Sequence, residues 1–222
     1  MGIFEKIKQS EDAVVEEMVA ENPALVEERN AAGLRPVMMA LYYGRKELAE
    51  ELRDRMASVD IWEASALGEL EPVASAVEQD RSLLDATSPD GFTPLGLAAF
   101  FGQVDVLTWL LTEGADPNKP AENEMAVYPI NSAAAHREKT AASMMVSLLV
   151  AQDAEVNVAQ HGGWTPLHQA ASHGDTQMVQ FLLESGADPS LESDDGRTAA
   201  DMARENKFGQ VAGLLEETTE RG

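Results

Sequence analysis

The sequence predicts an all-α fold, a solenoid of stacked helix pairs. Three observations predict it. One segment of the chain has the pattern of two short antiparallel helices, each with one apolar face. That pattern recurs along the chain at a regular spacing, and the first half of the chain contains a duplication without gaps.

The clearest unit is residues 164–189, with the sequence WTPLHQAASHGDTQMVQFLLESGADP. Thr165-Pro166 predicts a helix start, because threonine suits the N-cap and proline suits the first helical position. Gly174 ends this first helix, and Gly186 stands where the end of a second helix favours a left-handed residue. The apolar positions of the two helices, at helical spacing, are Leu167, Ala170, Ala171, Met178, Val179, Leu182 and Leu183.

The same unit recurs at residues 93–117, with TPLGLAAFFGQVDVLTWLLTEGADP, and Thr198 begins a further copy one period after Thr165. The T-P-L-H-x-A signature at this period is typical of ankyrin repeats. The chain therefore resembles an ankyrin-repeat protein, specifically the small ankyrin-only proteins common in bacteria. The resemblance implies binding of partners through turn tips and through exposed positions on the first helix of each pair.

Residues 1–58 align with residues 59–116 without a gap. The aligned identities include Ile3/Ile61, Glu5/Glu63, Gly33/Gly91, Pro36/Pro94, Gly44/Gly102 and Leu52/Leu110. Each of these two segments should therefore hold two helix pairs, which makes the divergent N-terminal region part of the stack.

We expect a single ankyrin-repeat domain over residues 1–222 with about seven repeats and short β-turn fingers. The expected repeats are 1–29, 30–58, 59–87, 88–121, 122–159, 160–191 and 192–222. The helices expected in the first three are Ile3–Gln9, Asp12–Ala20, Arg35–Tyr43, Lys46–Met56, Ile61–Leu67 and Leu70–Gln79. The third repeat lacks a D-G-x-T-P turn, so we expect a short connection before its first helix.

The fifth repeat departs most from the pattern. Pro166 follows Pro129 by four positions more than one period, and residues 135–140 replace the glycine between the helices. Insertions in solenoids usually lie in loops, so we expect extra loop residues there. At the other end of the stack, the polar residues Glu216–Gly222 suggest a terminal cap with a frayed tail.

The chain is strongly acidic, with 39 acids, 16 bases and a net charge of −23. This argues against nucleic acid and against anionic membranes, both of which favour clustered Lys and Arg. The charge is also compatible with a basic partner, or simply with solubility. Residues 56–136 carry a net −11 and should hold the most negative part of the stack.

The sequence has no long apolar run that could span a bilayer, no signal-peptide pattern and no cysteine, so we expect a cytoplasmic protein. It also has no catalytic constellation, cofactor motif or metal-ligand set. The family resemblance assigns His168 to a hydrogen bond with the neighbouring turn. Asp194-Asp195-Gly196 lacks the remaining ligands of a calcium loop and favours a turn.

Half of the 12 aromatic residues occupy positions that the resemblance assigns to partner contacts. We predict a concave binding face in repeats two to six, with acidic residues Asp90, Glu122, Glu124 and Asp195 around it. The predicted partner-binding residues are Tyr42, Tyr43, Asp90, Phe92, Phe100, Phe101, Glu124, Trp164 and His173. The alternative is that the aromatic residues pack between repeats, with Tyr42 and Phe100 the best candidates for that role.

The leading hypothesis is a non-enzymatic module that binds a protein with a basic and apolar surface. A second is a structural role in which the face forms a homo-oligomer, although we expect a monomer. A third is a small-molecule or enzymatic site beside residues 135–140, with His136, Arg137 and His173 as its polar groups. A closed pocket there would favour this third hypothesis, and a solvent-exposed loop would oppose it.

Overall fold

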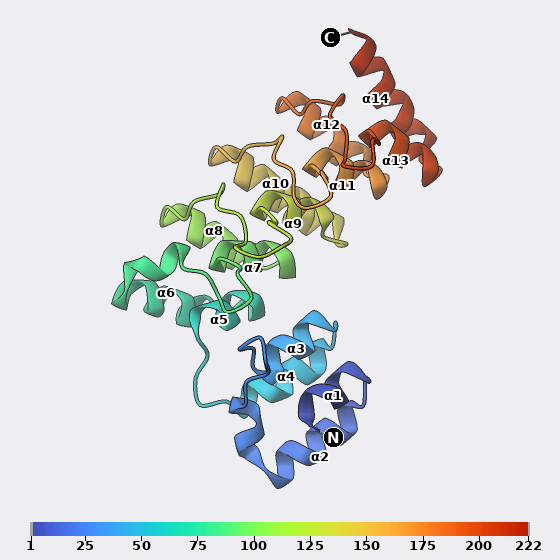
Figure 1. The fold of residues 1–222 in the computed structure, drawn as a ribbon. Helices are drawn as coiled ribbons and strands as arrows, with labels where there is room; N and C mark the ends of the chain where they lie inside the picture. Colours follow the sequence, from blue (N-terminus) through green and yellow to red (C-terminus); the bar gives the residue numbers. More distant parts are fainter. Residues whose placement is uncertain (1, 222) are drawn as a thin grey trace.

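The computed structural model describes residues 2–221, with side chains described as far as Thr219. This part of the chain consists of α-helices and two short 3₁₀ helices, η1 and η2, and it has no β-strand (Figure 1). The helices are α1 (Ile3–Lys8), α2 (Asp12–Glu21), η1 (Pro23–Glu27), α3 (Pro36–Tyr42), α4 (Lys46–Asp54), α5 (Ile61–Leu67), α6 (Leu70–Gln79), η2 (Arg81–Asp85), α7 (Pro94–Phe101), α8 (Val104–Thr112), α9 (Pro129–Ala135), α10 (Lys139–Ala151), α11 (Pro166–Ser172), α12 (Thr176–Glu184), α13 (Ala199–Glu205) and α14 (Gly209–Arg221). The predicted all-α solenoid is therefore confirmed.

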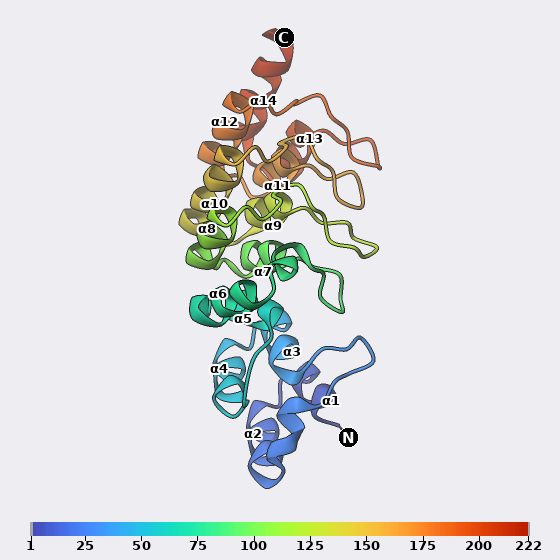
Figure 2. The ribbon, with the colours of Figure 1, turned by 90° about the vertical axis from the view of Figure 1, so that its left-hand side faces the viewer.

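The helices form two layers (Figure 2). The first helices of successive pairs stack as an inner layer, and the second helices stack beside them as an outer layer. Loops, which we call fingers, project from the inner side, and each finger is closed by a backbone hydrogen bond. The five closing bonds join Asn30 to Leu34, Ser88 to Phe92, Ala121 to Val127, Gln160 to Trp164 and Ser193 to Arg197.

The third repeat has no finger. Its first helix, α5, follows α4 after residues 55–60 alone, as the missing turn motif predicts. This gap changes how the neighbouring fingers meet. A Cβ atom on Gly33 in the first finger would lie 2.9 Å from Cβ of Pro89 in the next, so these two fingers pack directly together.

The duplication seen in the sequence is visible in the elements. The alignment of 1–58 with 59–116 pairs the start of each helix in the first segment with the start of a helix in the second. The pairs are α1 with α5, α2 with α6, η1 with η2, α3 with α7 and α4 with α8. The two 3₁₀ helices each bury one apolar side chain, Val26 or Leu84, beneath the start of the following finger. The two segments therefore share their local structure as well as their sequence.

The buried apolar residues form two clusters that meet where the two aligned segments join. One cluster comes mainly from residues 3–56, and the other runs from Ile61 to Leu215. A buried ion pair lies at this boundary: Arg35, the N-cap of α3, donates from Nε to Glu63 Oε1 at 2.6 Å and from Nη2 to Glu63 Oε2. Burial alone would lower the pKa of Arg35, but the carboxylates of Glu63 and Glu27 outweigh it and raise the pKa. The guanidinium therefore stays charged between the two clusters.

Threonine caps begin three of the inner helices, as the T-P motif predicts. Thr93, Thr165 and Thr198 each accept a hydrogen bond from the backbone amide three residues later. In α11 and α13 the third helical residue, His168 or Asp201, returns a bond to the N-cap amide and completes a capping box. These caps fix where each inner helix leaves its finger.

The expectation of a longer loop in the fifth repeat is wrong. The second helix begins at Lys139 after a first helix that begins at Pro129, the same offset as from Pro94 to Val104 in the fourth repeat. The extra residues instead lengthen α10 to 13 residues, against nine in α8 and α12. The added turn is helical because its residues include two alanines and a lysine, and because Glu138 caps it through the amides of Thr140 and Ala141.

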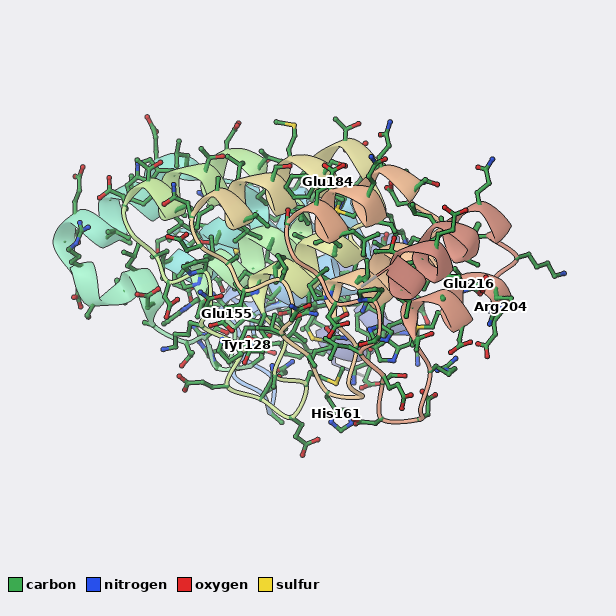
Figure 3. All side chains as sticks on the ribbon, turned by 90° about the horizontal axis from the view of Figure 1, so that it is seen from above. Tyr128, Glu155, His161, Glu184, Arg204 and Glu216 are labelled. Atoms are coloured by element: carbon green, nitrogen blue, oxygen red, sulfur yellow. The ribbon has the colours of Figure 1, made fainter. Side chains whose placement is uncertain are left out.

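The expectation of a frayed tail is also wrong, because α14 continues to Arg221. The hydroxyls of Thr218 and Thr219 donate to carbonyls one turn earlier, and Glu216 forms an ion pair with Arg204 of α13. Figure 3 shows this pair at the C-terminal end of the stack. Gly222, the last residue of the predicted tail, lies outside the described residues.

Candidate functional site

The fingers from the fourth repeat onward are joined by backbone hydrogen bonds. The amide of Glu122 donates to Gly91 O at 2.7 Å, His161 donates to Met125 O at 2.9 Å, and Asp194 donates to Gly162 O at 3.0 Å. The fingers and the inner helices behind them therefore form one continuous concave face, on which most of the predicted site residues lie.

Four predicted site residues form one aromatic cluster across the second and fourth repeats. The ring of Tyr42 lies 5.8 Å from Phe100 and 5.3 Å from Phe101, between centroids. Phe100 lies 5.0 Å from Phe101 and 6.0 Å from Phe92. In the third repeat, the position on the inner helix that corresponds to Tyr42 and Phe100 holds Ala66. Because this side chain is small, Tyr42 can reach across the third repeat to the fourth.

The cluster is fixed by a hydrogen bond to the finger. The Tyr42 hydroxyl donates to Asp90 Oδ2 at 2.5 Å, and Ser88 donates to the other oxygen of this carboxylate. Burial of the ring and the neighbouring Asp90 charge raise the pKa of Tyr42, so the hydroxyl remains a donor. Asp90 is therefore held inside the face as an acceptor.

Tyr42-Tyr43 and Phe100-Phe101 are two doublets of adjacent aromatic residues, and exposure separates the two members of each doublet. Tyr43 is 47% exposed and Phe100 is 43% exposed, whereas Tyr42 and Phe101 are partly buried against the N-terminal core cluster. Tyr42 packs between repeats as the alternative interpretation expects, but in the second doublet Phe101 takes that role more than Phe100. Tyr43 and Phe100 are the members left available for contact.

Next to Phe100 the concave face is hollowed by a cavity of about 420 Å³, which we call the concave cavity. Exposed Phe100 and Met125 stand on its wall, and Asn131 and Ser132 of α9 also line it. The Asn131 Oδ1 and Ser132 Oγ atoms are buried and have no hydrogen-bond partner among the described residues. Buried polar atoms normally have partners, so these two leave hydrogen-bonding capacity unused behind the cavity wall.

Asn131 occupies the signature position that His168 fills in the next repeat. His168 shares a hydrogen bond between its Nδ1 and the Thr165 hydroxyl, and its Nε2 bonds the carbonyl of Arg197 in the next finger. Asn131 keeps only the second of these roles, donating from Nδ2 to the carbonyl of Trp164. Burial lowers the pKa of His168, which therefore stays neutral and structural.

The remaining predicted site residues are spread more widely. Trp164 is partly buried in its finger, with its ring 6.5 Å from that of His168. Glu122 and Glu124 are exposed on the finger that carries Met125, and Asp195 is exposed in the last finger, paired with Arg197. His173 is exposed but lies at the end of α11, away from the aromatic cluster.

His173 belongs to a second cavity, of about 440 Å³, between the helix junctions of the fifth to seventh repeats. His136, Arg137 and Lys139 also line it, and we call these four residues the basic groove. Its apolar wall comes from Ala134, Ala142, Met178 and Phe208. The proposed polar groups of the small-molecule hypothesis are thus brought together, in an open groove beside the extra turn of α10.

Sequence reasoning missed three residues of the concave cavity: Met125, Asn131 and Ser132. One signal was present, because Tyr128-Pro129-Ile130-Asn131 stands where the signature has T-P-L-H. Among residues 2–221 the structure groups no three His, Cys, Asp or Glu side chains in a way that could hold a metal ion. No described helix combines the length and the apolar character needed to cross a bilayer.

Comparison with known proteins agrees with this architecture. The family model for three ankyrin repeats matches residues 130–220, and the model for a single ankyrin repeat matches residues 90–122. The chain belongs to the ankyrin-repeat family. Ankyrin repeats generally bind other proteins and are typically not enzymes, although they also occur within larger enzymes.

The similar curated proteins come from bacteria and animals. The chain is 40% identical over 83 residues to the ankyrin repeat protein YahD of Escherichia coli (strain K12), covering 35% of this chain and 41% of that protein. It is 30% identical over 143 residues to the rat "Ankyrin repeat and SAM domain-containing protein 6", covering 64% of this chain and 12% of the relative. The chain is 24% identical over 180 residues to the chicken nuclear factor NF-kappa-B p105 subunit, covering 76% of this chain and 18% of that protein. The match therefore spans less than half of each of these relatives.

Proposed function

We propose that this chain is a non-enzymatic module that binds another protein across the concave face of its fourth to sixth repeats. The observation that carries the proposal is the concave cavity, where exposed Phe100 and Met125 flank the unpartnered atoms of Asn131 and Ser132. An apolar side chain of the partner would cover Phe100 and Met125. Buried anchors of this kind supply most of the free energy of protein association.

The acidic surface complements a partner that is basic around its apolar anchor. Glu122 and Glu124 are exposed on the finger beside the cavity, and residues 56–136 carry a net −11. Such charges mainly speed the encounter, while the apolar contacts slow dissociation. The same charge disfavours nucleic acid and anionic membranes as partners. We also propose that the protein is cytoplasmic and that its repeats act as one domain.

Tyr42, Phe92 and Phe101 support the face from behind, and Phe100 is the cluster member that a partner would touch. Tyr43, Trp164 and His173 do not line the cavity, and they would contact only a partner that extends beyond it. The alternative that the face joins two copies of this chain uses the same exposed residues, so the experiment must separate the two partners.

The test is a site-specific photo-crosslinker placed at Met125, with a second variant carrying it at Met144 as the control. The two methionines are matched in exposure, 48% and 50%, but Met125 is on the finger and Met144 is on the outer helix α10. We expect one heterologous protein to be captured from Met125 in cells and lost when Phe100 is also changed to alanine. Equal capture from both positions would refute this face, and capture of a second copy from Met125 would favour the self-assembly alternative.

A further inference from the structure

The basic groove is unusual within this acidic chain. Of the residues from 56 to 222, only eight are Lys or Arg, yet Arg137 and Lys139 lie in the groove together with His136 and His173. The one acidic side chain in its lining is Asp175, whose Oδ2 lies 3.9 Å from Lys139 Nζ. Glu138, the neighbouring acid, is already engaged in capping α10.

Arg137 is a cation without a counter-charge. Among the described side chains of Lys and Arg, only Arg55, Arg137 and Lys207 make no ion pair with an acid. Arg137 also donates no hydrogen bond to a described residue. A free guanidinium has a planar set of donors that matches the two oxygens of a carboxylate or phosphoryl group.

Two departures from the repeat pattern build the groove. Arg137 occupies the place of the glycine that separates the helices in neighbouring pairs, such as Gly102 and Gly174. The second departure is Lys139 itself, which begins α10 where Val104 begins α8 and Thr176 begins α12. Glu138 uses the free amides at the start of this helix, so the side chains rather than the helix end would hold a ligand.

The groove is apolar on its other side and is continuous with the concave face. Phe208 covers Gly174 and, with Met178, gives the groove a wall of low polarity, next to which charge attraction is stronger than in open water. His136 and Arg137 line both the basic groove and the concave cavity. A segment that fills the cavity can therefore extend a charged side chain into the groove.

We propose that the basic groove binds an oxyanion, a carboxylate or phosphoryl group on a side chain of the protein that occupies the concave cavity. The inference that the oxyanion belongs to the partner protein rests on the proposed function, whereas the oxyanion site itself is inferred from the residues of the groove alone. Because most of the surrounding surface repels anions, a single acidic group in a basic partner has one favourable position, which fixes the register of binding.

The test uses amide NMR spectra of the isotope-labelled full chain at pH 7. Inorganic phosphate and acetate are titrated separately, with sodium chloride adjusted to hold the ionic strength constant. We expect saturable shifts confined to residues 136–139 and His173. The double variant Arg137→Gln/Lys139→Gln should weaken the affinity at least about tenfold.

The matched control is Lys46→Gln/Arg55→Gln, which removes the same charge from two exposed cations on and just after α4. It should leave the titration unchanged. Stronger binding of phosphate would indicate a phosphoryl group and stronger binding of acetate a carboxylate, and either supports an oxyanion site. Shifts that do not saturate, that spread along the chain, or that weaken equally in the control overturn the proposal. Crosslinking from Met125 is a separate measurement, so failure of this site would not be confused with failure of the binding face.

Discussion

Replacing Glu63 with alanine should destabilise the protein far more than loss of a surface carboxylate. Glu63 receives two hydrogen bonds from Arg35 and a third, at 3.0 Å, from the amide of Asp60. After the change, Arg35, which is 6% exposed, keeps Glu27, the carbonyl of Ser58 and, at 4.0 Å, the carboxylate of Asp60 as partners. Removing one partner of a buried pair costs about 3–5 kcal/mol, and because Glu27 remains we expect about 3 kcal/mol.

The position of this pair also predicts how the protein unfolds. In a repeat stack the coupling between neighbours keeps unfolding cooperative, and Arg35 and Glu63 lie where the two core clusters meet. Weakening that interface should let residues 1–58 unfold at lower urea than the remainder. Trp109 and Trp164 lie beyond this segment, whereas Trp62 packs against both clusters and is changed to phenylalanine in every variant compared. Fluorescence then reports the second part, whereas circular dichroism reports both.

In urea, the two signals should coincide in the wild type and separate in Glu63→Ala. The control is Glu216→Gln, which removes an exposed ion pair with Arg204 and should cost less than about 1 kcal/mol. The double variant Arg35→Met/Glu63→Leu should recover most of the loss, since apolar replacement of a buried pair is close to neutral. A Glu63→Ala cost no larger than that of Glu216→Gln, with coincident transitions, would refute the reasoning.

Three further predictions follow from single contacts. The pKa of His168 is lower in the folded protein than the usual 6.5, so its contribution to stability is complete above that pH and is lost as the pH falls through the folded value. Urea titrations between pH 7 and 5 should show this loss of stability in the wild type but not in a glutamine variant of His168. The control is a glutamine variant of His161, which projects from a finger tip (Figure 3) and should show the same loss as the wild type. Gly196→Ala should lower the stability by the ~1–2 kcal/mol expected for left-handed backbone strain, and Gly91→Ala should lower it clearly more. The reason is that, of these two sites, only at Gly91 would the new Cβ meet a carbonyl oxygen, at 2.7 Å. Equal melting temperatures of the two variants would contradict this. Tyr42→Phe should cost about 1.5 kcal/mol in chemical denaturation through loss of the hydrogen bond to a carboxylate, and a change below the error of the measurement would show that the ring packing alone holds the cluster.

Helix positions were predictable because local chemistry decides them. The T-P caps, the apolar spacing and the alignment of 1–58 with 59–116 all depend on neighbouring residues in the chain, and they located the helices of the first three repeats closely, with differences only at helix ends. The extra turn of α10 was not predicted, because residues 135–140 lack the glycine that marks a junction and a loop was the simpler expectation. The alanines at 141 and 142 and the capping carboxylate of Glu138 were the signal that favoured a helix there.

The binding face was predictable only in part, since exposure depends on contacts between repeats. Adjacent residues on a helix point about 100° apart, so each aromatic doublet must divide into a more buried and a more exposed member. Which member is buried depends on the bulk of the next repeat, and Ala66 leaves room for Tyr42 to reach Phe101. The sequence cannot show this without the register of the stack.

The missing finger of the third repeat accounts for the position of the candidate site. Without it, Gly33 packs against Pro89 and the Tyr42 hydroxyl bonds Asp90, so the first two fingers are tied together over the third repeat. The aromatic residues here fill the space left by the missing finger, and their rings mainly contact one another. Phe100 stands at the edge of that seal, where regular fingers resume and the concave cavity opens toward α9. Binding capacity should therefore begin at Phe100 and extend toward the C-terminal repeats, and substitutions at Tyr42 or Phe101 should weaken a partner only by loosening this support.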